Sequence, residues 1–237
     1  MRSKILVGGT IFLVLIVSQA PVGILQMLIP ENASVNLINT NGTLWAGQGQ
    51  LLIDRQPIGT IRWDLQGVTL LQGKVSYAIW AEDRDQNLTA ELTLLPDAGI
   101  SAADGTIEAS AVNRWLVPYN MELSGQFSLE DVSLLIENGR PTQAGGEVHW
   151  GGGPVTYTLA GETSTGLLPE MTAVLGPRAA AVVYASSGQT PLLHAELQEN
   201  GFARIGVTKL LTKMLNRPWP GTDADHAVVL EVEEQVF

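Results

Sequence analysis

Residues 42–79 read GTLWAGQGQLLIDRQPIGTIRWDLQGVTLLQGKVSYAI. Apolar and polar residues alternate along much of this stretch, and glycine-bearing turns interrupt it at short intervals. Alternation with a period of two residues is typical of β-strands that bury one face. The stretch therefore predicts several short antiparallel strands joined by tight turns.

Two phrases of this stretch return later in the same order. Residues 59–63 (GTIRW) and 75–79 (VSYAI) are matched by residues 146–150 (GEVHW) and 155–159 (VTYTL). We interpret this as a strand unit that is used twice, in repeat units at about 42–95 and 125–160.

The body at 30–237 shows the same pattern and no polar linker, so we expect one all-β domain with an antiparallel curved sheet or sandwich. We predict strands at 35–38, 43–45, 48–53, 58–65, 68–71, 74–80, 87–95, 119–129, 132–136, 146–150, 154–159, 179–186, 192–198 and 227–232. Asn-Gly and Pro-containing turns separate several of them, among them 39–42 and 55–57.

Three places favour helix instead. A short helix or loop is expected within 109–114, and one helical turn around 167–171. The best helical stretch is 207–215, where Thr208 can cap and Leu210, Leu211, Met214 and Leu215 form one apolar face.

The composition narrows the classes of function. The chain has 237 residues and a formal net charge of -11, and only 16% of its residues are charged. An acidic chain without basic clusters is a poor candidate for binding nucleic acid, which needs grouped Lys and Arg. The lack of cysteine excludes disulfides, cysteine-ligated metals and thiol catalysis.

Residues 5–29 carry no charge, and Arg2 and Lys4 precede them. The segment is long enough to cross a bilayer. We therefore expect a single transmembrane anchor, with residues 1–4 in the cytoplasm and the body across the membrane. The alternative is a signal peptide cleaved after Ala20; Pro21 would then follow the cut and obstruct the protease, so we favour the anchor.

The sequence offers few catalytic constellations. His149, His194 and His226 are far apart and have no metal-ligand spacing. The run Asp223-Ala224-Asp225-His226 could form a metal clip, but it is more typical of a solvated turn. Residues 82–85 resemble a charged hairpin tip. We therefore assign no catalytic, cofactor-binding or metal-binding residue and expect no enzyme and no cofactor.

The six tryptophans could line a groove for sugar or lipid, or they could pack in the core. For Trp63 and Trp150, at corresponding positions of the repeat, we expect core packing. Trp219 stands between Pro218 and Pro220, and we predict that it is exposed and contacts a partner.

Four phrases, in order, carry a resemblance to a known family. They are GTLWAG at 42–47, WDL at 63–65, LQG at 71–73, and PWPG at 218–221 before a Val-rich strand. With the short tip and single anchor, the chain resembles the type II secretion system protein N family (general secretion pathway protein N). Residues 101–120 contribute little to this resemblance.

The resemblance implies an accessory protein of the inner membrane of Gram-negative bacteria, with its bulk in the periplasm. It would support the export of folded proteins across the outer membrane, with other inner-membrane and periplasmic secretion components as partners. The family has no assigned catalytic residues, so none is carried over. The alternative is a periplasmic lipid-binding or lipid-transfer module with an AsmA-like β-groove, since repeated strands after an anchor could form a long curved sheet with an apolar inner face.

Overall fold

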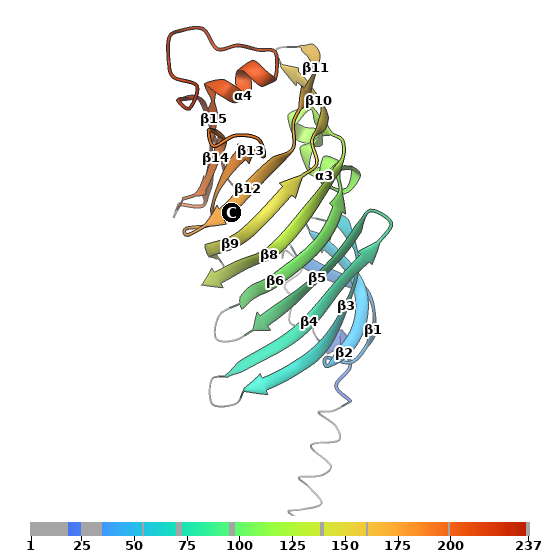
Figure 1. Cartoon of the computed structure of the whole chain (residues 1–237). Coiled ribbons are helices and arrows are strands. Elements are labelled where there is room, and N and C mark those ends of the chain that lie inside the picture. Colours follow the sequence, from blue (N-terminus) through green and yellow to red (C-terminus); the bar gives the residue numbers. More distant parts are fainter. Residues whose placement is uncertain are drawn as a thin grey trace, which may run out of the picture.

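The computed structural model describes residues 19–24, 35–53, 55–69, 73–94, 98–137, 140–159, 161–198 and 200–235. Within these residues the chain forms an antiparallel sheet of 13 strands, a second sheet of three strands and short helices (Figure 1). The predicted all-β, antiparallel class with a short C-terminal helix is confirmed. The large sheet runs as a meander, because most of its neighbouring strands also follow one another along the chain.

The strands of the large sheet, in spatial order, are β1 (Val35–Gly42), β2 (Ala46–Ile53), β3 (Gln56–Thr69), β4 (Lys74–Asp83), β5 (Gln86–Leu94), β6 (Ala98–Glu108), β8 (Gln126–Glu137), β9 (Arg140–Trp150), β12 (Met171–Gly176), β13 (Ala180–Ala185), β14 (Pro191–Leu197), β15 (Phe202–Thr208) and β16 (Val228–Gln235). The small sheet has the order β11 (Glu162–Leu168), β10 (Gly153–Leu159), β7 (Met121–Leu123). The helices are α3 (Ala109–Leu116), the 3-10 helix η1 (Val117–Tyr119) and α4 (Lys209–Met214).

The register gathers apolar side chains on one face of the large sheet. Trp63 of β3 lies opposite Ile79 of β4, which in turn lies opposite Ala90 of β5. One residue along, Asp64 lies opposite Ala78, which lies opposite Glu91. Because successive side chains point to opposite faces, one face is apolar and the other carries the charged residues.

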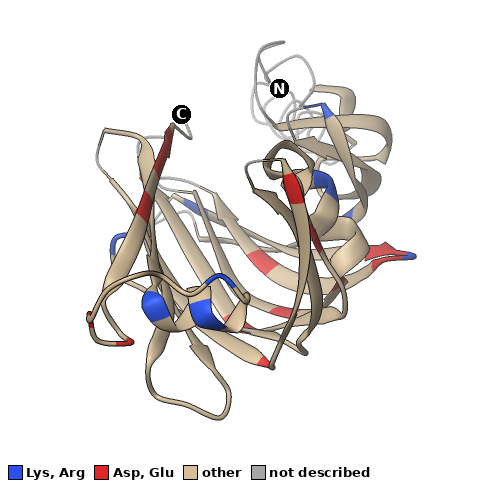
Figure 2. Cartoon of the chain, turned by 90° about the horizontal axis from the view of Figure 1, so that it is seen from above, with Lys and Arg blue, Asp and Glu red and all other residues tan. Residues whose placement is uncertain are grey.

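The sheet is strongly curved, and both of its ends turn toward the same side (Figures 1 and 2). Register shifts interrupt the β6–β8 and β8–β9 ladders, and bulges of this kind bend a strand and increase its twist. Gly105 and Gly146 have φ of +131° and +91°, and an added Cβ would collide with the carbonyl oxygens of Asn87 and Asp131. Glycine is therefore required at these two bends.

In the C-terminal half, the small sheet and α4 cover the apolar face. Val155 of β10, Leu168 of β11 and Leu211 of α4 are buried against Trp150 and Leu192 of the large sheet. The hydroxyl of Tyr157 donates to the carbonyl oxygen of Leu215 at 2.6 Å, which joins β10 to the end of α4. This half holds the hydrophobic core of the described residues.

The proposed twofold strand unit is not reproduced as a repeated strand pair. The Trp63 strand pairs directly with the Tyr77 strand, but the Trp150 strand pairs with β8 and β12, while β10 lies in the small sheet. The cause is the glycine run between β9 and β10. Gly152 and Gly153 have φ of +74° and +139°, so the chain turns out of the large sheet there.

Several local predictions also need correction. Residues 43–45 are a turn rather than a strand, because the Thr43 hydroxyl accepts the backbone N–H groups of Trp45 and Ala46 at 3.2 Å. The predicted turn at 39–42 belongs to β1, with a register shift between Ile38 and Asn41.

The predicted strands 58–65 and 68–71 are mostly one strand, β3, which is bulged between Leu65 and Gly67. The helical turn at 167–171 is wrong, because β11 and β12 occupy this region. The predicted strand 119–129 is divided between β7 and β8.

Both remaining helix predictions are confirmed, as α3 and α4. Leu211 is buried in the core, and the other three residues of the predicted apolar face of α4 pack against it. Thr208 stands at the N-cap position, but its hydroxyl donates to the carbonyl oxygens of Pro191 and Leu192 at 3.0 Å instead of capping the helix. The predicted strand pair 179–186 and 192–198 is confirmed as β13 and β14.

Of the predicted anchor at 5–29, only residues 19–24 lie within the described residues. Pro21 forms an isolated bridge with Thr43, the backbone N–H of Leu44 donates to the carbonyl oxygen of Ala20 at 2.9 Å, and Val22 is buried. The chain therefore contacts the body at Pro21, before the predicted end of the anchor. Among the helices that can be described, none has both the length and the apolar composition for a membrane span.

Candidate functional site

The apolar face of the large sheet contains a hollow of about 140 Å³ in the N-terminal half. Its lining comes from β1, β3, β4, β5 and the turn before β2: Leu37, Leu44, Ile61, Trp63, Tyr77, Ile79, Leu92 and Leu94. Trp63 is buried, whereas the others are half-buried. Burial raises the pKa of the Tyr77 phenol above its ordinary value. We call this hollow the apolar trough.

A second cavity of about 250 Å³ lies on the same face in the C-terminal half. Its floor includes Phe127, Trp150 and Val183 of the large sheet, and its other walls include Val155 of the small sheet and Leu211 of α4. The rings of Phe127 and Trp150 stack with centroids 6.2 Å apart. This cavity is thus lined by the chain's own covering elements as well as by the large sheet.

The opposite face of the sheet carries Asp64 of β3 and Glu91 of β5. Acidic residues are spread over several strands (Figure 2). His149 projects on this face, beside a hollow of about 350 Å³. Its Nδ1 lies 2.9 Å from the Thr172 hydroxyl, and its Nε2 lies 3.5 and 3.4 Å from carboxylate oxygens of Glu130 and Glu147.

A hydroxyl, an imidazole and a carboxylate in contact are the elements of a nucleophilic triad. Here both carboxylate distances exceed a hydrogen bond. Thr172 is also in the middle of a three-strand pairing, opposite His149 of β9 and Tyr184 of β13, where the backbone N–H groups serve the ladder. The arrangement around His149 fits a half-exposed polar patch of the sheet.

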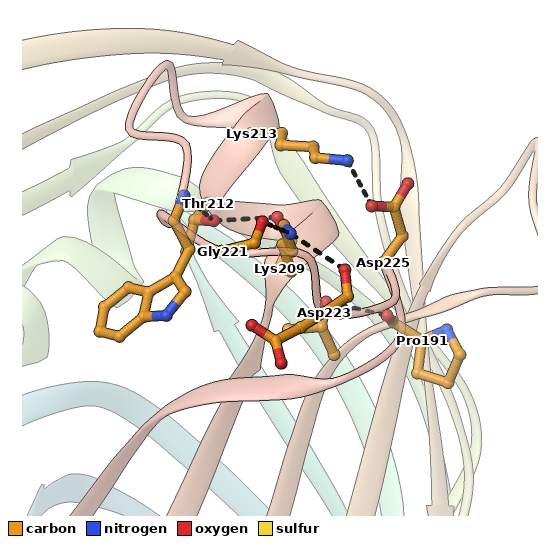
Figure 3. A network of polar contacts seen from close by, with 9 residues as sticks. Pro191, Lys209, Thr212, Lys213, Gly221, Asp223 and Asp225 are labelled. Carbon is orange, nitrogen blue, oxygen red and sulfur yellow. Dashed lines mark hydrogen bonds and ion pairs between the residues drawn. The ribbon is translucent and has the colours of Figure 1, made fainter.

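The loop between α4 and β16 is built around a buried lysine (Figure 3). Lys209 is 6% exposed, and its Nζ donates to the carbonyl oxygens of Gly221 and Asp223 at 2.6 and 2.9 Å. The Thr212 hydroxyl donates to the Lys209 carbonyl oxygen at 2.9 Å and accepts the backbone N–H of Trp219 at 3.3 Å. We call residues 216–227 the C-terminal loop.

This loop carries the predicted contact residue. The Trp219 side chain is 39% exposed, although its backbone is held by Thr212. The structure therefore presents an exposed tryptophan on an anchored loop, and the partner contact itself stays a prediction.

The residues of the possible metal clip at 223–226 bind lysines of α4 instead. The carbonyl oxygen of Asp223 binds Lys209, and the carboxylate of Asp225 forms an ion pair with Lys213, which lowers the pKa of Asp225 below its ordinary value. No cluster of three or more potential metal ligands occurs among the residues that the structure describes. At the β4–β5 hairpin, Glu82 pairs with Arg62 and Asp83 accepts the backbone N–H of Arg84, as expected for a charged tip.

Comparison with known families gives one result. The family model described as "Type II secretion system (T2SS), protein N" matches residues 33–213. The chain belongs to the type II secretion system protein N family. No curated protein and no solved structure matches the chain.

The matched part extends from just before β1 into α4. It includes the apolar trough, His149 and the lining of the second cavity except Leu215. It excludes Trp219, the C-terminal loop and β16, so the PWPG phrase at 218–221 lies beyond the matched part.

Two features of the chain were missed by sequence reasoning. One is the strand register that makes the apolar face continuous, since an apolar inner face was raised only within the lipid-module alternative. The other is Lys209. Its signal was a lysine next to Leu210 and Leu211 at the start of a helix with a buried face.

Proposed function

We propose that this chain is a non-enzymatic accessory of the type II secretion system that is held at the inner membrane, with its β body in the periplasm. The family match over 33–213 is the observation that carries this proposal. The uncharged segment 5–29 behind Arg2 and Lys4 supports the membrane attachment and the orientation.

In this function the body contacts other secretion components, and β16 with the adjacent C-terminal loop forms the contact region. β16 is the last strand of the large sheet, and the edge of a sheet can pair with a strand of a partner. Val228, Leu230 and Val232 of this strand are exposed, and Trp219 adds an exposed aromatic ring on the loop before it. Tryptophan is enriched at the energetic centres of protein interfaces.

The proposal is tested by placing a photo-crosslinking amino acid at Trp219 or at Val232 in the native membrane. We expect covalent products with other type II secretion proteins from both sites. The matched control is Leu167 of β11, which is 76% exposed and lies outside the contact region. If Leu167 gave the same crosslinked products in equal yield, β16 and the C-terminal loop would not be a specific contact region.

A second experiment tests the accessory role itself. Deletion of the gene is expected to reduce protein secretion or the assembly of the secretion complex, and the intact chain to restore it. The Trp219→Ala chain is expected to fold normally, because no core side chain is changed. It is expected to restore secretion less well than the intact chain, because the exposed ring of the contact region is missing. Unchanged secretion and assembly after deletion would contradict the function.

A further inference from the structure

The apolar trough offers an occupant almost no hydrogen-bonding groups. β3 and β4 each pair on both sides, so their backbone N–H and C=O groups are used by the ladders. The indole N–H of Trp63 donates to the Thr43 carbonyl oxygen at 3.1 Å. Among the described lining residues, the Tyr77 hydroxyl is the one polar side-chain group left. A group that lies along this trough must therefore be apolar over its length.

The size of the trough restricts the occupant further. A helix with its side chains is about 10–12 Å across, which is too wide for a hollow of about 140 Å³. An extended peptide that lies on this face across the strands would bury its own N–H and C=O groups without partners, at a cost of a few kcal/mol each. Apolar cavities of about this volume bind small hydrocarbons. A few methylenes of a single hydrocarbon chain fit this volume, whereas the full width of a helix does not, and a peptide lying across the strands would leave its polar backbone groups without partners.

The trough also lies where the N-terminal segment joins the body. The backbone N–H of Leu44, one of its lining residues, donates to the carbonyl oxygen of Ala20, and Val22, two residues after Ala20, is buried. Beyond the trough the apolar face continues: Leu92 is opposite Ile100, which is 37% exposed, and Ile100 is opposite Leu134. In the C-terminal half this face is covered by the small sheet and α4.

We propose that the apolar trough binds an acyl chain of a membrane phospholipid. This inference rests on the membrane attachment in the proposed function, which brings the Leu44 end of the trough to the bilayer surface. The acyl chain enters beside Leu44, lies against Ile61, Ile79 and Leu92, and is limited by the covered C-terminal half.

The full chain is reconstituted into vesicles of phosphatidylethanolamine and phosphatidylglycerol that contain a phospholipid with a photoreactive diazirine at the end of one acyl chain. After illumination, mass spectrometry maps the labelled residues. We expect labels within β3, β4 and β5 in addition to any on the N-terminal segment. A diazirine on the headgroup is expected to leave these three strands unlabelled.

Two variants of β4 provide a matched pair. Ile79→Lys places an ammonium in the trough and is expected to reduce acyl labelling of β3 and β5 about tenfold or more, because a charge without a partner is unfavourable in an apolar site. Ala78→Lys puts the same side chain on the opposite face, between Asp64 and Glu91, and is expected to label like the wild type. Circular dichroism and Trp fluorescence verify that both variants fold.

Wild-type labels confined to the N-terminal segment would overturn the proposal, even if Ile79→Lys failed to fold. Equal labelling of the Ile79→Lys and Ala78→Lys chains would also overturn it. Flotation with vesicles separately reports membrane attachment, and complementation of the deletion reports the role in secretion. Failure of the trough is thereby distinguished from failure of the proposed function.

Discussion

Both halves of the large sheet have an apolar face, but the two faces are buried to different extents. In the C-terminal half, the small sheet and α4 cover the face, and Leu192 and Val155 are 0% and 1% exposed. In the N-terminal half, Trp63 is buried, but the other lining residues of the trough stay half-buried. Among the described residues, the small sheet and α4 cover only the C-terminal half of the apolar face, and the tight core is found under this cover.

The two halves do share one device. Trp63 donates its indole N–H to the Thr43 carbonyl oxygen at 3.1 Å, and Trp150 donates to the Ser124 carbonyl oxygen at 2.8 Å. Each ring thus ties a strand to a nearby non-strand segment while it buries its apolar surface. What separates the halves is therefore the cover, since both have a buried anchoring ring.

The difference between the halves is tested most directly by truncating one leucine to alanine in each half. Leu192→Ala is expected to lower the free energy of unfolding by about 2–5 kcal/mol, because it leaves a cavity in a close-packed core. Leu92→Ala in the trough is expected to cost less than about half of that, because its side chain is already partly exposed. Urea unfolding of the full chain in detergent, followed by circular dichroism, measures both changes.

Equal losses for the two leucines would mean that the N-terminal face is as tightly packed as the C-terminal one. A variant that changes the slope of the free energy of unfolding against urea concentration, and not only the midpoint, would have a changed compactness of the folded or unfolded state.

A substitution at Lys209 is expected to loosen the C-terminal loop next to α4. Lys209→Met keeps most of the apolar stem but removes the ammonium that holds the carbonyl oxygens of Gly221 and Asp223. We expect a loss of about 1–3 kcal/mol, the range for hydrogen bonds to charged groups. Hydrogen–deuterium exchange should become faster across residues 209–227 and stay unchanged in β3–β5.

Lys213→Met is the matched control on the same helix. It removes only the solvent-exposed ion pair with Asp225, which contributes little in water. If both variants exchanged at the same rate, the C-terminal loop would not depend on the buried lysine.

Much of this architecture was predictable because it is set locally. Alternation located most strands, and the apolar spacing of 207–215 located α4. The large size of Trp63 and Trp150 in strand positions predicted their burial, which is confirmed. These features depend on neighbours within a few residues, where side-chain period and turn chemistry decide the outcome.

The remainder depends on partners far along the chain. The VTYTL strand repeats the VSYAI pattern, yet β10 pairs with β7 and β11 because the glycine run turns the chain away from β9. No periodicity reveals which half of the sheet is covered, since that depends on where α4 folds back. The burial of Lys209 depends on carbonyl groups of Gly221 and Asp223, which the sequence separates from it by a proline-rich turn.

The smallest expected effect is a pH dependence of hydrogen exchange in the C-terminal loop that β3–β5 do not share. The hydrogen bond from Lys213, and then the nearby charges of Lys213, Lys209 and His226, lower the pKa of Asp225 below its ordinary value. A carboxyl group whose pKa is lower in the folded state stabilises that state above its unfolded pKa of about 3.9, and this contribution is lost as the pH falls through the lowered pKa.

Below about pH 4 we therefore expect exchange in the C-terminal loop to accelerate, after correction for the intrinsic pH dependence of exchange, relative to β3–β5 of the trough. Asp225→Asn removes the titrating group and should abolish this additional pH dependence. If the loop of the Asn variant still loosened on acidification, another group would be responsible. Glu233 of β16 would then be the first to test, because hydrogen bonds from Gln198 and Arg204 lower its pKa as well.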